Sequence, residues 1–266
     1  MKSLPRAFVI LLTVCLTAAI SRADHHTSDE KLTFVLVHGA TAGGYEWKET
    51  GKYLQQAGHT VYRVTLTALG ERSHLSAEGV NLTTHINDVV NTILFEDLHD
   101  VILTGHSYGG MVITGVMDRI PERISHVYYF DAAVPADGQS IRDSFGNRGG
   151  DRPEPKVENG RMVMDWLPKN PTSWPHNTGH PIGTLTEPVS YKNPAALALN
   201  VTYVPFVKDA EAEKTRSESD AGWQRAKARG WTIRPYPGSH TAMLETPKGL
   251  AELILASVND TNTPTP

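Results

Sequence analysis

The 266-residue chain has a single cysteine, Cys15, and no run of basic residues. Because Cys15 lies in an N-terminal segment that we expect to be removed, the mature chain has neither a thiol nor a disulfide. A cysteine nucleophile and a thiolate zinc site are thereby excluded. Lys and Arg number 25 against 29 acidic residues, a net charge of −4. With no P-loop and no G-x-G-x-x-G after a strand, the sequence predicts no nucleic-acid partner.

The first 23 residues have the pattern of a secretory signal. Lys2 and Arg6 precede an apolar stretch at 7–20, and the small residues Ser21 and Ala23 mark a cleavage position. The stretch is short for a membrane span, although an uncleaved anchor is the alternative. We expect cleavage after Ala23, no stable membrane anchor afterwards, and a secreted or periplasmic chain.

Residues 24–266 alternate between apolar runs and helical patterns, which predicts one α/β domain with a doubly wound, mostly parallel sheet. The expected strands are 32–37, 60–64, 101–104, 127–130, 201–207 and 231–234. The expected helices are 47–57, 87–98, 111–120, 220–229 and 247–258. Between about 135 and 200 the composition shifts toward Pro, Gly, Asn, Trp and His. This shift predicts an inserted lid after the strand that ends near Phe130.

Ser107 is the predicted nucleophile. It stands in Gly105-His106-Ser107-Tyr108-Gly109-Gly110, a G-x-S-x-G run between a short apolar strand and a helical pattern. Such a strand–turn–helix is a nucleophile elbow, in which glycines allow the strained turn and the close approach of the helix to the strand. A Gly-rich turn without chemistry is the alternative.

A serine nucleophile needs a base, and His240 is the predicted base. It follows the last expected strand, so it emerges at the same sheet edge as Ser107. Two residues compete for the acid. Asp131 ends a strand in an almost wholly apolar segment, where a buried carboxylate requires a partner. Asp209 follows another strand but opens a charged, solvated run. We favour Asp131 and keep Asp209 as the alternative.

Two backbone amides are expected to form the oxyanion hole. One is that of Tyr108, directly after the nucleophile, and the other is that of Ala40 in the loop after the first strand. Gly39 lets this loop approach the substrate, and Thr41 is a further candidate substrate contact. From the lid, the candidate pocket residues are the aromatic side chains Trp166, Trp174 and Tyr191.

The chain resembles the α/β-hydrolase superfamily, and more closely its branch of plant methyl esterases, hydroxynitrile lyases and pyrethroid-type carboxylesterases. The matching segments are Phe34 to Ala40, Gly105 to Gly110 and His240 to Leu244. Lyases of this branch carry threonine in place of Gly39 and lysine in place of Thr241, so the resemblance favours an esterase. The plant esterases have their acid where Asp209 stands, whereas some dehalogenase-like members have one at the position of Asp131.

The expected function is therefore a serine esterase that cleaves small or medium hydrophobic carboxylic esters through an acyl-enzyme on Ser107. No metal or organic cofactor is implied, and the expected partner is a small-molecule ester. A lactonase or a carbon–carbon hydrolase would use the same residues. A ligand-binding protein without catalysis on this scaffold is the alternative from another class.

Overall fold

We describe the protein from a computed structural model, which covers residues 31–144, 156–169 and 171–261. The predicted signal sequence, residues 1–23, lies outside the described residues. None of the helices within the described ranges has the length and apolar character needed to span a membrane.

The central sheet has six strands in the order β10-β8-β4-β3-β1-β2, and every pair is parallel. The strands are β1 (Thr33–Val37), β2 (Thr60–Val64), β3 (Val101–His106), β4 (Ile124–Phe130), β8 (Asn200–Val204) and β10 (Thr232–Ile233). All residues of β3 are buried, as expected for the middle of a parallel sheet covered on both faces. The predicted fold class is confirmed.

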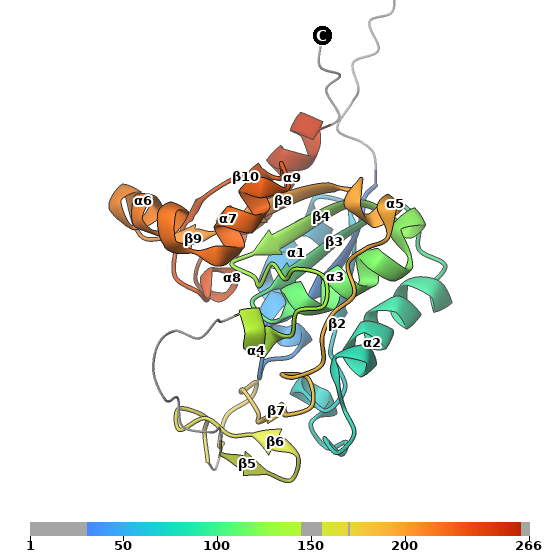
Figure 1. The fold of residues 1–266 in the computed structure, drawn as a ribbon, viewed down its shortest axis with the longest axis vertical. Coiled ribbons are helices and arrows are strands. Elements are labelled where there is room, and N and C mark those ends of the chain that lie inside the picture. Colours follow the sequence, from blue (N-terminus) through green and yellow to red (C-terminus); the bar gives the residue numbers. More distant parts are fainter. Residues whose placement is uncertain (1–30, 145–155, 170, 262–266) are drawn as a thin grey trace, which may run out of the picture. The chain divides into compact units, whose positions relative to one another are not determined.

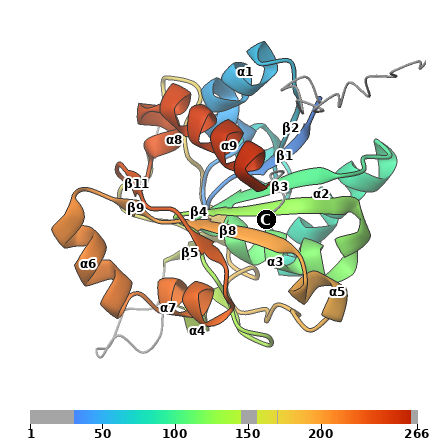
Figure 2. The same cartoon turned by 90° about the horizontal axis from the view of Figure 1, so that it is seen from above.

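Helices cover both faces of the sheet (Figures 1 and 2). One face carries α1 (Lys48–Gln56), α8 (Ala242–Glu245) and α9 (Pro247–Thr261). The other carries α2 (Leu82–Phe95), α3 (Gly109–Arg119), α5 (Pro194–Leu197) and α7 (Ala221–Ala228). Val35 and Val37 of β1 join the second layer, whereas Phe34 and Leu36 join the first, because successive side chains of a strand point to opposite faces.

The segment predicted as a lid contains short regular elements. They are α4 (Ile141–Ser144), the antiparallel strands β5 (Val157–Glu158), β6 (Arg161–Met162) and β7 (His180–Pro181), and α5. Arg161 fastens this small sheet to the loop after β2, since its guanidinium donates to the carbonyls of Ser73 and Leu75, each at 2.9 Å. The small sheet of the insertion is thus docked on the domain by hydrogen bonds from the Arg161 side chain to main-chain carbonyls.

Three elements differ from the expected pattern. The strand expected at 201–207 breaks at Pro205, which has no N–H to donate, and β9 (Phe206–Val207) then pairs with β11 (Tyr236–Pro237). The charged run after Asp209 forms α6 (Ala210–Ser219). Helix α2 begins five residues earlier than expected, because Asn81 caps it by accepting from the Thr84 amide at 2.9 Å. Three 3-10 turns complete the described structure, η1 (Gly44–Trp47), η2 (Gly70–Arg72) and η3 (Pro121–Arg123).

Candidate active site

Ser107 lies on the sharp turn between β3 and α3. Its φ is +51°, in the left-handed region that non-glycine residues seldom adopt. The flanking glycines make this turn possible. A Cβ on Gly105 would lie 2.8 Å from the Gly109 carbonyl oxygen, and one on Gly110 would lie 2.1 Å from that of Ala133. The turn at Ser107 thus has the predicted geometry of a nucleophile elbow. A buried strand precedes the serine, and a buried helix follows it.

The structure brings Ser107, His240 and Asp131 together. The Ser107 Oγ lies 3.0 Å from His240 Nε2, and His240 Nδ1 forms a hydrogen bond with Asp131 Oδ2. His240 comes from the loop between β11 and α8, and Asp131 directly follows β4. Because these groups stand at the carboxyl ends of their strands, residues far apart in sequence meet at one edge of the sheet.

Asp131 is buried and carries further partners on its other oxygen. Oδ1 accepts a hydrogen bond from the Phe206 amide at 3.2 Å and from the Arg216 guanidinium of α6. Burial raises the pKa of Asp131, but the hydrogen bond from His240 and the positive charge of Arg216 outweigh it, and the net shift is downward. The carboxylate therefore stays ionised although its side chain is only 8% exposed.

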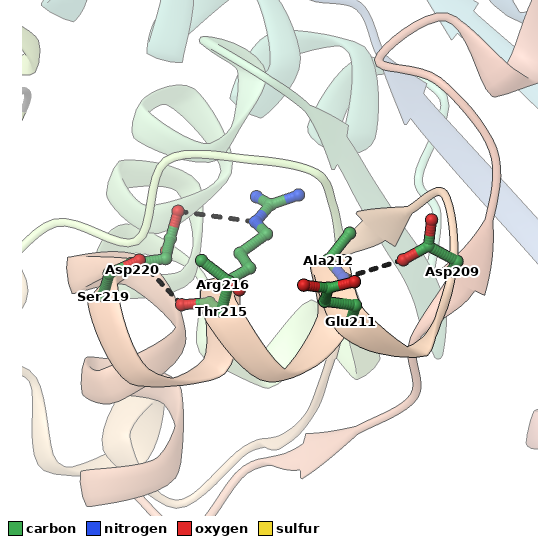
Figure 3. A pocket seen from close by; sticks show the side chains of 7 residues that line it. All are labelled: Asp209, Glu211, Ala212, Thr215, Arg216, Ser219 and Asp220. Carbon is green, nitrogen blue, oxygen red and sulfur yellow. Dashed lines mark hydrogen bonds and ion pairs between the residues drawn. The ribbon is translucent and has the colours of Figure 1, made fainter.

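Asp209 lies elsewhere. It caps the N-terminus of α6, where its Oδ1 accepts from the Ala212 amide at 2.8 Å (Figure 3). Its side chain is exposed, and its hydrogen bond within the described residues is to Ala212 rather than to His240. The structure thus brings the favoured acid to the histidine and leaves the alternative as a helix cap.

The loop after β1 lies beside Ser107. A Cβ on Gly39 would approach the Ser107 Cβ to 3.1 Å, so only glycine lets the loop pack this closely. Within the described residues, the amides of Ala40 and Tyr108 donate to no other protein group. Thr41 is buried and faces the insertion, where its amide donates to His180 Nδ1 at 3.2 Å. This arrangement leaves two amides near Ser107 for a ligand oxygen.

A cavity of about 310 Å³ opens at Ser107. Its lining combines the three triad positions with apolar and charged groups: Ala132, Ala133, Val134, Ser144, Arg216, Asp220, Ala221, Gly222 and Arg225. Arg216 and Asp220 also line a second cavity, of about 770 Å³, along α6 (Figure 3).

The aromatic residues proposed for the pocket lie elsewhere. Trp166 and Trp174 are 61% and 76% exposed and do not line the cavity at Ser107. Tyr191 is buried in the core beneath Arg229, whose guanidinium lies 4.6 Å from the ring centroid. Gly39 and Thr41 flank the cavity without lining it. The aromatic signal in the sequence therefore reflects lid surface and core packing among the described residues.

Sequence reasoning missed two charged groups at this site, Arg216 and Glu46. Glu46 lies 3.1 Å from His106 Nδ1, and both side chains are buried. Neither group follows a recognisable motif, since each reaches the site from a helical turn distant in sequence. No group of three or more His, Cys, Asp or Glu residues that could hold a metal occurs in the described part of the chain.

Comparisons with known proteins find similarity to hydrolases and esterases. The sequence profile described as "Alpha/beta hydrolase family" matches residues 34–253. Over 108 residues the chain is 56% identical to a carbendazim hydrolyzing esterase from Nocardioides sp. (strain SG-4G), covering 41% of this chain and 45% of that protein. Over 122 residues it is 31% identical to Methylesterase 1 of Arabidopsis thaliana, covering 44% and 46%. The chain thus matches less than half the length of either relative.

A solved structure matches over a greater length. It is an extracellular alpha/beta-hydrolase from a Paenibacillus species, described as sharing structural and functional homology with Tobacco Salicylic Acid Binding Protein 2. The alignment has a TM-score of 0.63 and 25% sequence identity, and covers 85% of this chain and 98% of that one.

Proposed function

This chain belongs to the alpha/beta hydrolase family, and from that membership we propose that it is a serine esterase acting on small or medium hydrophobic carboxylic esters. One observation carries the proposal. Ser107, His240 and Asp131 form a continuous hydrogen-bonded series, with the serine hydroxyl at the mouth of a cavity. The names of its relatives, a carbendazim hydrolyzing esterase and a methylesterase, support ester hydrolysis.

In the first half of the reaction, His240 Nε2 takes the hydroxyl proton as Ser107 Oγ attacks the ester carbonyl carbon. The carbonyl oxygen becomes an oxyanion, which accepts hydrogen bonds from the Ala40 and Tyr108 amides. His240 then donates its proton to the departing alkoxide, and an alcohol leaves. The acyl group remains esterified to Ser107. Asp131 holds His240 in the required orientation and stabilises the imidazolium.

In the second half, His240 removes a proton from water, and the resulting hydroxide attacks the acyl carbon. The bond to Ser107 Oγ breaks, Oγ regains the proton from His240, and a carboxylic acid is released. None of these steps requires a metal or an organic cofactor.

The cavity supports the size and character of the substrate. A volume of about 310 Å³ is at the small end of ligand pockets. Its apolar wall is formed by Ala132, Ala133 and Val134, directly after Asp131. This wall suits a short acyl or alcohol chain.

We also propose that the chain is exported. Lys2, Arg6, the apolar stretch at 7–20 and the small residues Ser21 and Ala23 support a cleaved secretory signal. Mass spectrometry of the N-terminus after expression with its own leader tests this. Asp24 as the first residue supports export, whereas a retained Met1 on an exported chain contradicts cleavage.

Short-chain nitrophenyl esters test the catalytic proposal. Ser107→Ala is expected to lower turnover by several orders of magnitude, since it removes the nucleophile. Ser125→Ala is the control, because Ser125 lies at the start of β4, far along the chain from Ser107, and in the described structure its hydroxyl bonds to the main-chain carbonyls of Asp100 and Val101. A fluorophosphonate should attach once per chain, at Ser107. Unchanged turnover in Ser107→Ala, or loss of activity to a chelator with recovery on added zinc, would overturn the serine mechanism.

A further inference from the structure

Two buried ionisable side chains behind Ser107 take no part in the proposed reaction. Glu46 Oε1 and His106 Nδ1 lie 3.1 Å apart, and their side chains are 7% and 3% exposed. Removing two charges from water costs several kcal/mol for each ion, and their mutual attraction seldom exceeds that cost. A pair of this kind calls for a role other than stability.

Glu46 is connected to the loop that carries one proposed oxyanion donor. It lies in η1, and its Oε2 accepts a hydrogen bond from the Gly39 amide at 2.8 Å. Gly39 directly precedes Ala40. One carboxylate therefore holds this loop through one oxygen and faces His106 through the other.

His106 lies beside Ser107 and His240. It directly precedes Ser107, and its ring centroid lies 4.6 Å from that of His240. Neither ring nitrogen has an aligned hydrogen-bond partner within the described ranges. The contact of the ring with Glu46 is thus a close approach of 3.1 Å without an aligned hydrogen bond.

The surrounding charges favour an ionised pair. Burial opposes the charge on Glu46 and on His106, but the two attract each other, so the pKa of Glu46 is lowered and that of His106 is raised. Four ionisable groups face His106: Glu46 from η1, His38 after β1, Asp131 after β4, and His240 before α8. The two carboxylates and the backbone of His240 raise the pKa of His106, whereas His38 opposes a second positive charge.

We propose that Glu46 is a positioning residue, which ties the loop bearing the Ala40 amide to the turn bearing Ser107 and holds His106 as a cation against His240. This inference rests on the proposed function. Its geometric effect is to fix the distance between the nucleophile and the oxyanion donor. Its electrostatic effect is to hold the charge of His106 next to the Glu46 carboxylate, with the His106 ring 4.6 Å from that of His240 between centroids.

Glu46→Gln separates charge from shape, because glutamine still offers an oxygen to the Gly39 amide. We expect kcat on a nitrophenyl ester to fall roughly tenfold with KM changed less than twofold, since an oxyanion donor acts mainly in the transition state. Glu46→Ala, which also removes the acceptor, should lower kcat by about 10²- to 10³-fold. Glu49→Gln is the control, as Glu49 is exposed and, in the part of the chain that the structure describes, pairs with Lys52.

The pH profile distinguishes this role from a structural one. Because the pKa of His106 is raised, the ion pair is complete below that value and is lost as the pH rises through it. Wild-type kcat should therefore decline on the basic side, and this decline should be absent in Glu46→Gln. A variant that loses folding stability but keeps the wild-type kcat and pH profile overturns the inference.

Two readouts do not need turnover, so they separate this inference from the proposed function. The first is the rate at which a fluorophosphonate labels Ser107, which should fall in Glu46→Gln but not in Glu49→Gln. The second is ¹⁵N NMR of the His106 ring, identified by its absence in His106→Gln, which should show a doubly protonated ring at pH 7 that becomes neutral in Glu46→Gln. Equal labelling rates, or a neutral wild-type ring, overturn the inference even if the protein hydrolyses esters. If the protein hydrolyses no ester, the proposed function is wrong. The labelling rate and the NMR spectrum still test the role of Glu46.

Discussion

Ser107 and Asp131 share an unusual backbone conformation. Their φ angles are +51° and +46°, and each residue directly follows a strand of the central sheet. Such a conformation costs about 1–3 kcal/mol for a non-glycine residue and persists only where neighbouring contacts enforce it. Here the Ser107 carbonyl accepts from Ala133 at 2.9 Å, and the Asp131 amide donates to Val204 at 2.9 Å. The strain directs both side chains away from the sheet toward His240.

The first prediction concerns the acid. Asp131→Asn should lower turnover by up to about 10⁴-fold at neutral pH, because an amide cannot stabilise the imidazolium and favours the wrong tautomer of His240. Asp209→Asn should cost little, since asparagine also caps helices. Both variants are compared in one ester assay. Near-normal activity in Asp131→Asn with collapse in Asp209→Asn would transfer the role to Asp209.

The second prediction concerns Arg216, whose charge helps to keep the pKa of Asp131 low. An acid with a lowered pKa supports the site above that value and fails as the pH falls through it. Arg216→Met raises that pKa, so the acidic limb of kcat/KM should move to higher pH. Arg216→Lys should move it less, and the exposed Lys214→Met should not move it. An unchanged limb in Arg216→Met would refute this coupling.

At the residue scale, the sequence predicted those site residues that stand in a recognisable local pattern. Ser107 was marked by its glycines, His240 by its place after a strand, and Asp131 by its apolar neighbours. Arg216 could not be predicted, because it contacts a carboxylate 85 positions away from within a charged run. Glu46 was equally hidden, since its partners are a main-chain amide and the histidine of the elbow itself.

At the scale of elements, α6 shows why a real helix escaped prediction. None of its residues is buried, so the sequence has no apolar periodicity to mark it. Caps define its ends, with Asp209 at the start and Asp220 opening α7. Arg216 connects α6 to the rest of the domain. Its guanidinium donates to the Phe206 carbonyl at 2.8 Å and to the Tyr203 hydroxyl at 3.2 Å. The helix thus depends on a polar anchor rather than on a hydrophobic face.

The third prediction tests the packing of α3 against the segment after Asp131. Gly110→Ala places a methyl group 2.1 Å from the Ala133 carbonyl oxygen, so the helix or the segment must move. We expect a loss of about 1–3 kcal/mol in unfolding free energy and a clear fall in turnover. Gly51→Ala in α1 is the matched helical control, with its nearest atom at 3.3 Å. Equal stability of the two variants in urea would contradict the close packing.

At the scale of the whole molecule, four buried histidines have lowered pKa values, mainly through burial. The pKa is about 3 for His85 and about 4 for His126, and it is also lowered for His38 and His180. In the unfolded chain these groups take up protons near pH 6.5, so stability falls as the pH drops below that value.

The fourth prediction is therefore acid destabilisation without carboxylate protonation. Between pH 7 and 5.5 the unfolding free energy should fall by about 1 kcal/mol for each of His85 and His126, and His38 and His180 should act in the same direction. His126→Gln should reduce this loss of unfolding free energy by about 1 kcal/mol. In the described structure the His126 ring forms its hydrogen bond with Thr202. The exposed His99→Gln is the control. Urea unfolding at both pH values measures the slope, and an unaltered slope in His126→Gln would disprove the assignment.

The central sheet was predictable from the sequence, whereas the short strands within the predicted insertion were not. Expected strands of four to seven residues correspond to β1, β2, β3, β4 and β8, and their alternation with helices predicts parallel pairing. The resemblance to the methyl esterase branch is likewise confirmed by relatives of that kind. The strands β5, β6 and β7 have two residues each, which is too short for any periodicity.

The contact between Thr41 and the insertion limits how this protein can be redesigned. The Thr41 carbonyl accepts from the Thr178 amide at 2.8 Å, and the Thr41 amide donates to His180, so the insertion also holds the loop after β1 that lies beside Ser107. A chimera that exchanges residues 156–184 for those of a relative would alter turnover even when the substrate stays the same. Grafts intended to change specificity must therefore carry their own partners for Thr41.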